Sequence, residues 1–224
     1  MTDELTLYHY WRSSASYRVR IALNLKGLPY RIVPVHLLED GGQQHAEAYR
    51  QLNPQGLVPT LLHNGHAIGQ SVAIIEYLDE AFKGPSLLPS HPVARANARA
   101  MAMYVVSEGQ PMMNLRVLQY LQSEHHLDET ARNAWVRHWL QVNFSAVEKQ
   151  LAALPKGNAF AFGDAPGLLE CCLVPHAFAA ARFSLDMTPY PEVQALIAKC
   201  QTLPAFIAAH PGRQPDTPEE FRVL

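Results

Sequence analysis

The first third of the chain alternates between short apolar runs and stretches in which apolar residues recur at helical spacing. The short runs predict β-strands at 5–8, 30–33, 60–63 and 66–68. Helical spacing predicts helices from the serines at 13–16 to Lys26-Gly27, over 46–52, and from residue 71 onward. The order of elements before residue 83 is therefore β-α-β-α-β-β-α.

Three local signals mark the turns and helix starts of this region. Asn64-Gly65 between two apolar runs is the strongest short signal for a β-hairpin with a type I′ turn. Pro59, in Val58-Pro59, cannot donate a ladder hydrogen bond and so belongs at the start of a strand. Ser71 is expected to cap the third helix. A βαβ unit followed by a hairpin and a helix predicts a thioredoxin-like α/β domain.

The rest of the chain is helical in pattern and follows a linker that contains three prolines. Helices are predicted at 93–110, 112–122, 128–151, 168–183, 191–200 and from Pro204. The segment 168–183 is apolar on nearly all sides and should be the buried central helix. The proline-rich, charged tail at 211–224 is expected to pack loosely. The predicted domains are an α/β domain at 1–83, a linker at 84–92 and an all-α domain at 93–224.

Composition and charge exclude several classes of protein. Hydrophobic residues make up 48% of the 224 residues, which is enough for a substantial core. The formal net charge is −2 without a long basic run, so nothing favours nucleic-acid binding. No apolar run is long enough to span a membrane, and the N-terminus lacks a signal-peptide pattern. Three cysteines without a C-x-x-C, and scattered histidines, favour a reducing cytoplasm and no metal site.

The strongest candidate for chemistry is the serine-rich loop between the first strand and the first helix, Arg12-Ser13-Ser14-Ala15-Ser16. The first turn of a helix has unpaired N–H groups and the positive end of the helix dipole, so it attracts an anion. Arg12 and Arg18 add positive charge, and a thiolate or carboxylate placed there would be stabilised. A serine before a helix is also an ordinary N-cap, and this stretch alone leaves both interpretations open.

The stretch from Arg12 to Leu23 resembles the signature R-S-S-C-S-x-R-V-R-I-A-L of zeta-class glutathione transferases. Further matches occur in order along nearly the whole chain: Asp40-Gly41-Gly42-Gln43-Gln44, Leu52-Asn53-Pro54, Val58-Pro59, Gln70-Ser71, Gln110-Pro111, Asn114-Leu115 and Arg182-Phe183. The chain is similar to this family, and within it to bacterial members that isomerise maleylacetoacetate. The resemblance implies the glutathione transferase fold, which combines a thioredoxin-like domain with an all-α domain.

The resemblance also implies glutathione as cofactor and assigns its binding residues. Ser13 and Ser14 would be catalytic, with the Ser13 hydroxyl bonded to the glutathione sulfur. The other implied contacts to glutathione are Ala15, Ser16, Tyr17, Arg18, Gln44, Val58, Gln70, Ser71, Gln110, Asn114, Leu115 and Arg116. Val58 would pair with the cysteinyl main chain through a cis proline, and Gln70 and Ser71 would hold the γ-glutamyl carboxylate.

A small dicarboxylate is the implied substrate, and Arg12, Arg116 and Arg182 are the candidate clamps for its carboxylates, since guanidinium binds carboxylate in a bidentate manner. The implied reaction is cis–trans isomerisation of maleylacetoacetate to fumarylacetoacetate, in tyrosine and phenylalanine catabolism, by reversible addition of the glutathione thiolate. The family further implies a homodimer, and no nucleic-acid or membrane partner. Without the family, Arg116 would be interpreted as a solvated helix residue and Arg182 as a helix-end cation.

Two departures from the family pattern bear on these expectations. Ala15 stands where the signature has cysteine, which removes a second sulfur but leaves Ser13 intact. Gly167 replaces a capping threonine before the central helix, while Glu170 keeps the partner carboxylate of a capping box.

Two alternatives to maleylacetoacetate isomerisation stay open. One is isomerisation of maleylpyruvate in gentisate catabolism, and Asp40-Gly41-Gly42-Gln43-Gln44 favours maleylacetoacetate over it. The other is a non-catalytic module of the same fold that binds a protein partner, against which the intact Ser13, Gln70 and Ser71 argue.

Overall fold

The computed structural model describes residues 4–223 and divides by its contacts into two compact units. The first unit combines the described parts of Met1–Leu87 and Thr202–Leu224, and the second is Leu88–Gln201. The sequence did not indicate that the segment from residue 202 belongs with the N-terminal unit. The expected domain boundaries at 83 and 93 stay a prediction, because compactness and independent folding are different properties.

The first unit is built on a four-stranded mixed sheet. Its strands are β1 (Leu5–His9), β2 (Tyr30–Pro34), β3 (Thr60–His63) and β4 (His66–Gly69), in the order β2-β1-β3-β4. β1 is parallel to β2 and antiparallel to β3, and β3 is antiparallel to β4. This topology confirms the predicted thioredoxin-like α/β architecture.

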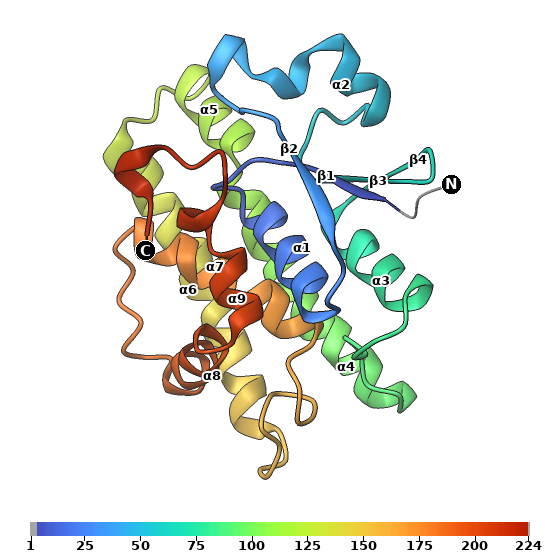
Figure 1. The fold of residues 1–224 in the computed structure, drawn as a ribbon. Coiled ribbons are helices and arrows are strands. Elements are labelled where there is room, and N and C mark those ends of the chain that lie inside the picture. Colours follow the sequence, from blue (N-terminus) through green and yellow to red (C-terminus); the bar gives the residue numbers. More distant parts are fainter. Residues whose placement is uncertain (1–3, 224) are drawn as a thin grey trace. The chain divides into compact units, whose positions relative to one another are not determined.

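The helices of this unit are α1 (Ser14–Leu25), α2 (Glu47–Leu52), α3 (Ser71–Ala81) and α9 (Pro204–Ala209). Figure 1 shows α1 and α3 on one side of the sheet and α2 on the other. α1 packs against both α3 and α9. Leu7 and Leu61 of the sheet, together with Val19 and Ile74 of the helices, are fully buried, so this side holds the core that fixes the start of α1.

Two of the predicted turn signals are confirmed by the backbone. Asn64 and Gly65 have φ of 49° and 81°, and a type I′ turn requires positive φ at both central residues. α1 ends at Leu25, and Gly27 follows with a φ of 64°. The Leu28 N–H returns to the Leu23 carbonyl at 3.0 Å, as in a Schellman motif.

The expectation that Ser71 caps α3 is wrong. α3 begins at Ser71 itself, and the residue in the N-cap position is Gln70, which has a φ of 64° and makes no side-chain cap. The Ser71 hydroxyl is buried and accepts a hydrogen bond from Arg18 Nη1 at 3.0 Å. The sequence shows the residue type at a helix start, but not that a buried guanidinium binds its hydroxyl.

The expectation of a loosely packed tail is also wrong. Pro211, Gly212, Gln214 and Thr217 are buried within the first unit. Gln214 Nε2 donates to the carbonyls of Ala208 and His210, at 3.0 and 2.8 Å. The prolines and charges of the tail indicate only its local backbone preference. Its packing is fixed by hydrogen bonds to residues outside the tail's own turns, which the local pattern does not show.

The second unit is all-helical among its described residues, as predicted. Its α-helices are α4 (Pro92–Met103), α5 (Leu115–Ser123), α6 (Glu129–Ala153), α7 (Leu168–Arg182) and α8 (Pro191–Gln201). The helix expected over 93–110 ends at Met103 and continues as a π-helical turn over Tyr104–Gly109 and a 3-10 turn over Gln110–Met113. Two features explain the break: Pro111 has no N–H, and Gly109 lies so close to Asn143 that no Cβ would fit there.

α7 is buried along most of its length, which confirms the predicted central helix. Its first turn depends on the buried Glu170. One carboxylate oxygen accepts the Gly167 N–H at 2.8 Å and the other accepts the Ala161 N–H at 3.0 Å. Burial raises the pKa of Glu170, and these amide hydrogen bonds oppose the shift. The carboxylate thus supplies one half of a capping box, the acceptor for the N-cap amide, while Gly167 has no side chain for the other half.

We expect Glu170→Ala to lower the free energy of unfolding by about 3 kcal/mol, because two amides lose their acceptor in a buried place. Asp128 caps α6 by accepting the Ala131 N–H at 2.8 Å in an exposed position. Asp128→Ala should therefore cost only about 1 kcal/mol. Urea unfolding of both variants checks this, and equal losses would contradict the role given to Glu170.

Candidate functional site

The site predicted in the first unit centres on Ser13, the N-cap residue of α1. The Ser13 hydroxyl oxygen accepts the Ser16 N–H at 3.2 Å, and the Ser13 N–H donates to the Tyr10 carbonyl at 3.0 Å. The side chain is only partly buried. A hydroxyl has two lone pairs and one hydrogen, so capping uses acceptor capacity and leaves the O–H to donate. Ser13 can therefore be an ordinary N-cap and a donor to a bound anion at once, the two interpretations that the sequence left open.

Ser14 and Ala15 form the first turn of α1 and are half-buried. The positive end of the helix dipole lies at this turn and stabilises a negative charge placed before it. Ser16 differs from its neighbours, because its side chain is fully buried and accepts the Tyr10 N–H at 3.4 Å. The structure thus places Ser16 among the groups that hold the loop.

Tyr17 and Arg18 extend from α1 into the core. Tyr17 is 2% exposed, and its ring lies 5.4 Å from the Arg20 guanidinium and 6.2 Å from the His210 ring. Arg18 is 1% exposed and donates to the Ser71 hydroxyl. Arg18 therefore joins α1 to the first residue of α3 and brings a positive charge beside the start of α3.

Gln70 and Ser71 mark the start of α3. Gln70 is exposed, and its amide Nε2 donates to Gln55 Oε1 at 2.7 Å. The Ser71 hydroxyl, held by Arg18, keeps its own hydrogen for donation. A carboxylate at this helix start would meet backbone amides, a hydroxyl and the field of a guanidinium.

Gln44 is buried beside a glycine turn. Its Nε2 lies 3.3 Å from the Leu37 carbonyl and 3.1 Å from His45 Nε2. Its Oε1 is buried and has no hydrogen-bond partner within residues 4–223. Gly42, at a φ of 96°, lies against this amide so closely that a Cβ would collide with it. A buried acceptor without a partner is the feature expected where a ligand N–H binds.

Val58 precedes Pro59 in a cis peptide bond, which confirms the cis proline that the family resemblance implied. The chain before it is anchored at the Leu57 carbonyl, which accepts from Tyr49 Oη at 2.6 Å and from Asn53 Nδ2 at 2.9 Å. Our sequence analysis missed these two supporting side chains. Leu52-Asn53-Pro54 is one of the family matches, but no local signal relates Asn53 to the Leu57 carbonyl.

Arg12, the remaining candidate of this unit, is half-buried in the turn before Ser13. Its guanidinium lies 5.5 Å from the centre of the Trp11 ring. This contact supports the guanidinium on an aromatic face.

The other candidates lie in the second unit. Gln110 starts the 3-10 turn, Asn114 occupies the N-cap position of α5 without a side-chain cap, and Leu115 and Arg116 begin that helix. Arg116 is exposed. Trp135 Nε1 of α6 donates to the Met112 carbonyl at 2.7 Å, which anchors the turn between Gln110 and Asn114.

Arg182 is the last residue of α7 and is exposed. Its guanidinium lies 5.6 Å from the Phe183 ring. This position fits the helix-end cation that the sequence predicts without reference to the family, and it leaves the guanidinium accessible to an anion.

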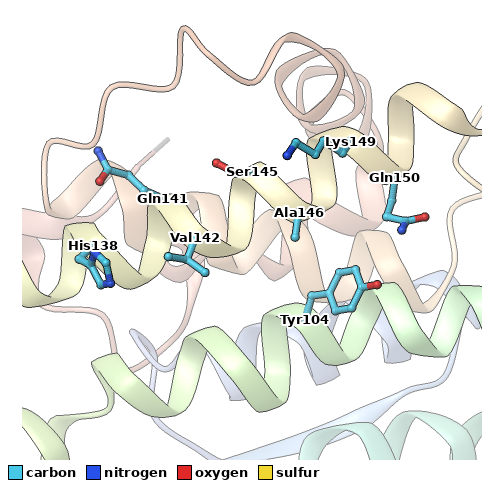
Figure 2. Close-up of a pocket in the computed structure, with 8 residues that line it drawn as sticks. All are labelled: Tyr104, His138, Gln141, Val142, Ser145, Ala146, Lys149 and Gln150. Atoms are coloured by element: carbon cyan, nitrogen blue, oxygen red, sulfur yellow. The ribbon is translucent and has the colours of Figure 1, made fainter.

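A hollow of about 600 Å³ lies along α6 in the second unit, lined by Tyr104 and by α6 residues such as His138, Val142 and Lys149. Figure 2 shows the Tyr104 ring facing α6 near Ala146, while Lys149 points away from it. None of the candidate residues lines this hollow. Within residues 4–223, no group of three or more His, Cys, Asp or Glu side chains gathers as a metal site would require.

Comparison with known proteins identifies the family. A model of the glutathione S-transferase N-terminal domain matches residues 7–86. A probable maleylacetoacetate isomerase of Vibrio cholerae is 42% identical over 95% of this chain and 98% of its own length. A maleylpyruvate isomerase of a Ralstonia species is 45% identical over 95% of this chain and the whole of its own.

Solved structures agree with these relatives. A holo maleylpyruvate isomerase, described as a bacterial zeta-class glutathione S-transferase, superposes with a TM-score of 0.92 at 44% identity, covering 95% of this chain and all of that chain. A maleylacetoacetate isomerase of Methylobacterium extorquens, solved with malonate and glutathione, gives a TM-score of 0.90 at 36% identity, over 95% and 99% of the two chains. The chain belongs to the zeta class of the glutathione S-transferases.

This zeta-class chain has no helix, among its described residues, that is long and apolar enough to cross a membrane. Each of its three cysteines is buried in the second unit, in α7 or α8. Burial also raises the pKa of the Cys200 thiol. A reactive sulfur at Ser13 would have to come from a bound molecule.

A network of buried polar groups behind the Ser13 loop was missed by the sequence analysis. His9 Nδ1 lies 3.0 Å from Arg20 Nη1, and His9 Nε2 lies 3.1 Å from Asp216 Oδ1. Burial, with a smaller contribution from the Arg20 charge, lowers the pKa of His9. More than two hundred residues separate the two ends of this network, so no spacing in the sequence could reveal it.

The lowered pKa of His9 predicts that acid weakens the fold. Unfolded chains take up a proton at this residue near the ordinary value of 6.5, and the folded chain resists protonation until lower pH. The free energy of unfolding should therefore fall as the pH decreases through and below 6.5. Denaturant unfolding across this range should show a weaker pH dependence in His9→Gln. An unchanged slope would show that His9 does not contribute.

Proposed function

We propose that this chain is a glutathione-dependent cis–trans isomerase that converts maleylacetoacetate to fumarylacetoacetate. The observation that carries the proposal is the Ser13 hydroxyl at the N-terminus of α1, whose oxygen caps the helix while its hydrogen stays available to a thiolate. Relatives at more than 40% identity over almost the whole chain are named as isomerases of two closely similar substrates.

Three features of the first unit fit a glutathione molecule. The Ser13 hydroxyl and the α1 dipole suit its sulfur as a thiolate. Gln44 Oε1, which has no partner among the residues that the structure describes, suits a peptide N–H, and the backbone of Val58 offers main-chain pairing. Gln70 and Ser71, at the start of α3, suit the γ-glutamyl carboxylate. The contacts assigned to Gln110, Asn114, Leu115 and Arg116 rest on the family resemblance.

The chain's own residues act mainly on the ionisation and placement of the thiol. Free thiols ionise near a pKa of about 8.5, so a nucleophile at neutral pH needs a stabilised anion. Donation by the Ser13 hydroxyl and the positive end of the α1 dipole both favour the thiolate. Ser14 and Ala15 would contribute first-turn amides. When bound, glutathione supplies a thiolate that adds reversibly to the activated cis double bond, so that the bond can rotate before the thiolate leaves.

Arginines would bind the substrate and the charge that develops on it. Maleylacetoacetate carries two carboxylates, and the candidates are Arg12, Arg116 and Arg182. Arg116 and Arg182 are exposed and Arg12 is half-buried, so each guanidinium is reachable by an anion. An arginine or backbone N–H beside the substrate carbonyl would stabilise negative charge delocalised onto its oxygen.

The rest of the proposal rests on the family: a homodimer in the cytoplasm, with no nucleic-acid or membrane partner. A neighbour solved with malonate and glutathione binds a small dicarboxylate, which supports a dicarboxylate substrate for this chain. Sedimentation equilibrium of the purified protein tests the dimer.

The main prediction is that isomerisation requires catalytic glutathione and the Ser13 hydroxyl. Ser13→Ala should lower kcat by about tenfold or more, because the thiolate loses a preorganised donor. A spectrophotometric assay with and without glutathione measures both effects. Full activity without glutathione would refute the proposal.

Two further variants separate catalysis from capping. Ser13→Asn keeps an N-cap residue but lacks the hydroxyl, so kcat should fall with little loss of stability. Asp128→Ala removes the cap of α6 instead, so stability should fall while kcat is retained. If Ser13→Asn were as active as the natural chain, the hydroxyl would have only a structural role.

Maleylpyruvate is the second candidate substrate, because the Ralstonia relative at 45% identity and the structure with a TM-score of 0.92 are maleylpyruvate isomerases. We expect kcat/KM to be higher for maleylacetoacetate. Parallel assays with the two substrates at fixed glutathione decide between them, and a preference for maleylpyruvate would replace the substrate while leaving the mechanism in place.

A further inference from the structure

The turn that precedes Ser13 is held by side chains from remote parts of the first unit. The Trp11 N–H donates to Asp216 Oδ2 at 3.0 Å, and the Trp11 carbonyl accepts from Arg20 Nη2 at 3.1 Å. Both backbone polar groups of Trp11 are thus bound by charged side chains. The Trp11 ring is buried and stacks on Phe221, with ring centres 5.3 Å apart and planes inclined by 26°.

His9 lies between the two side chains that bind Trp11, because it contacts both Arg20 and Asp216. Arg20 can only donate, so His9 Nδ1 accepts from Arg20 Nη1, and the ring hydrogen is then on Nε2. Nε2 lies 3.1 Å from Asp216 Oδ1, so a neutral His9 places its N–H beside that carboxylate. Burial by itself would raise the pKa of Asp216, but its hydrogen bonds with His9 and the Trp11 N–H hold the pKa below its ordinary value.

We propose that Asp216 is a positioning residue for Ser13, which it holds in its catalytic geometry through the backbone of Trp11. The inference rests on the proposed function, because it assumes that the Ser13 hydroxyl meets the glutathione sulfur. Asp216 acts through the turn and touches neither cofactor nor substrate.

The geometry of the turn explains how a change at Asp216 reaches Ser13. The Ser13 N–H is bonded to the Tyr10 carbonyl, so Tyr10 to Ser13 forms one tight turn with Trp11 at its second position. A shift of the Trp11 backbone therefore moves the residue two positions later. Misplacement of a catalytic group by about 1 Å can lower a rate by roughly a hundredfold. The position of the Ser13 hydroxyl, which would donate to the thiolate, therefore depends on the Asp216 carboxylate that holds Trp11.

The C-terminal segment supplies two contacts to Trp11, the Asp216 carboxylate on its N–H and the Phe221 ring on its side chain. Figure 1 shows this segment running beside the blue chain that leads from β1 into α1. It is itself anchored, since the Val223 N–H donates to the Gly212 carbonyl at 3.0 Å and the Thr217 N–H to the Gln214 carbonyl at 3.1 Å. Asp216 therefore projects from a fixed segment.

Asp216→Asn tests the proposal with almost no change of volume. The Trp11 N–H and His9 Nε2 approach different oxygens of Asp216, so in the amide an NH2 group would replace one of these oxygens and would oppose a donor. We expect kcat to fall by about tenfold, with the KM for glutathione little changed because Gln44, Gln70 and Ser71 are untouched. Titration of the ultraviolet absorbance of bound thiolate should show a glutathione pKa higher than in the natural chain.

Asp79→Asn is the matched control. Asp79 is also a nearly buried carboxylate of the first unit, with its side chain 10% exposed against 11% for Asp216. It pairs with Lys26 at 3.1 Å and accepts the Leu87 N–H at 2.9 Å, far from the Ser13 turn in the chain. A merely structural role predicts that both variants lose stability and keep kcat. The positioning role predicts that only Asp216→Asn loses kcat and shifts the thiolate titration.

Phe221→Ala keeps the test valid if Asp216→Asn fails to fold. Phe221 is 50% exposed, so its loss should spare the fold while it removes the ring stacked on Trp11, and we expect a smaller fall of kcat in the same direction. Unchanged kcat and thiolate titration in the folded variants would overturn the inference. If the natural chain itself showed no isomerisation, the proposed function would fail, and the thiolate titration would still decide the role of Asp216.

Discussion

One hydroxyl group at the start of α1 has to meet two demands. The helix needs an acceptor for an amide of its first turn, and a thiolate needs a donor. Ser13 meets the first demand with its oxygen, which accepts the Ser16 N–H. Because a hydroxyl also carries a hydrogen that rotates freely, the second demand does not compete with the first. Asparagine or aspartate could cap the helix equally well, but neither offers a hydroxyl hydrogen with the same reach.

That arrangement depends on two arginines buried in the same helix. Charges are costly to bury unless hydrogen bonds satisfy them. Arg20 donates to the carbonyls of Trp11 and Ala209 and to His9, and burial lowers its pKa to about 10, so it stays charged at neutral pH. Arg18 donates to Ser71. Together they bind α1 to β1, α3 and the C-terminal segment through directional contacts, which fix the helix start more closely than apolar packing alone.

The sequence predicted those parts of the fold that local chemistry determines. The strands, the Asn64-Gly65 hairpin and the Gly27 helix end each need only neighbouring residues, and all are confirmed. The failures share a different cause. Ser71 is held by Arg18, and the tail is ordered by Trp11 and α9, so in both cases the deciding partner is remote in sequence.

The candidate site divides in the same way. Ser13 could be located from its position between a strand and a helix, and its neighbours Ser14 and Ala15 follow from that. Gln44, Gln70 and the second-unit residues were named only through the family signature, since no period or spacing points to them. Neither the local sequence pattern nor the family signature pointed to Asp216. Its role depends on a backbone N–H of Trp11, and a backbone group leaves no trace in the residue types of a sequence.

The loss of the signature cysteine at Ala15 makes the source of sulfur clearer. A cysteine in the first turn of α1 would compete for the same dipole and could form a mixed disulfide with a bound thiol. The cysteines that this chain retains are buried in α7 and α8, where burial raises the pKa of Cys200 and opposes thiolate formation. The anion-stabilising features at the start of α1 therefore act on no sulfur of the described chain. They are suited to a sulfur that arrives with a ligand. In the same unit Gln44 Oε1 has no hydrogen-bond partner among the described residues, which favours a ligand that also carries a peptide N–H.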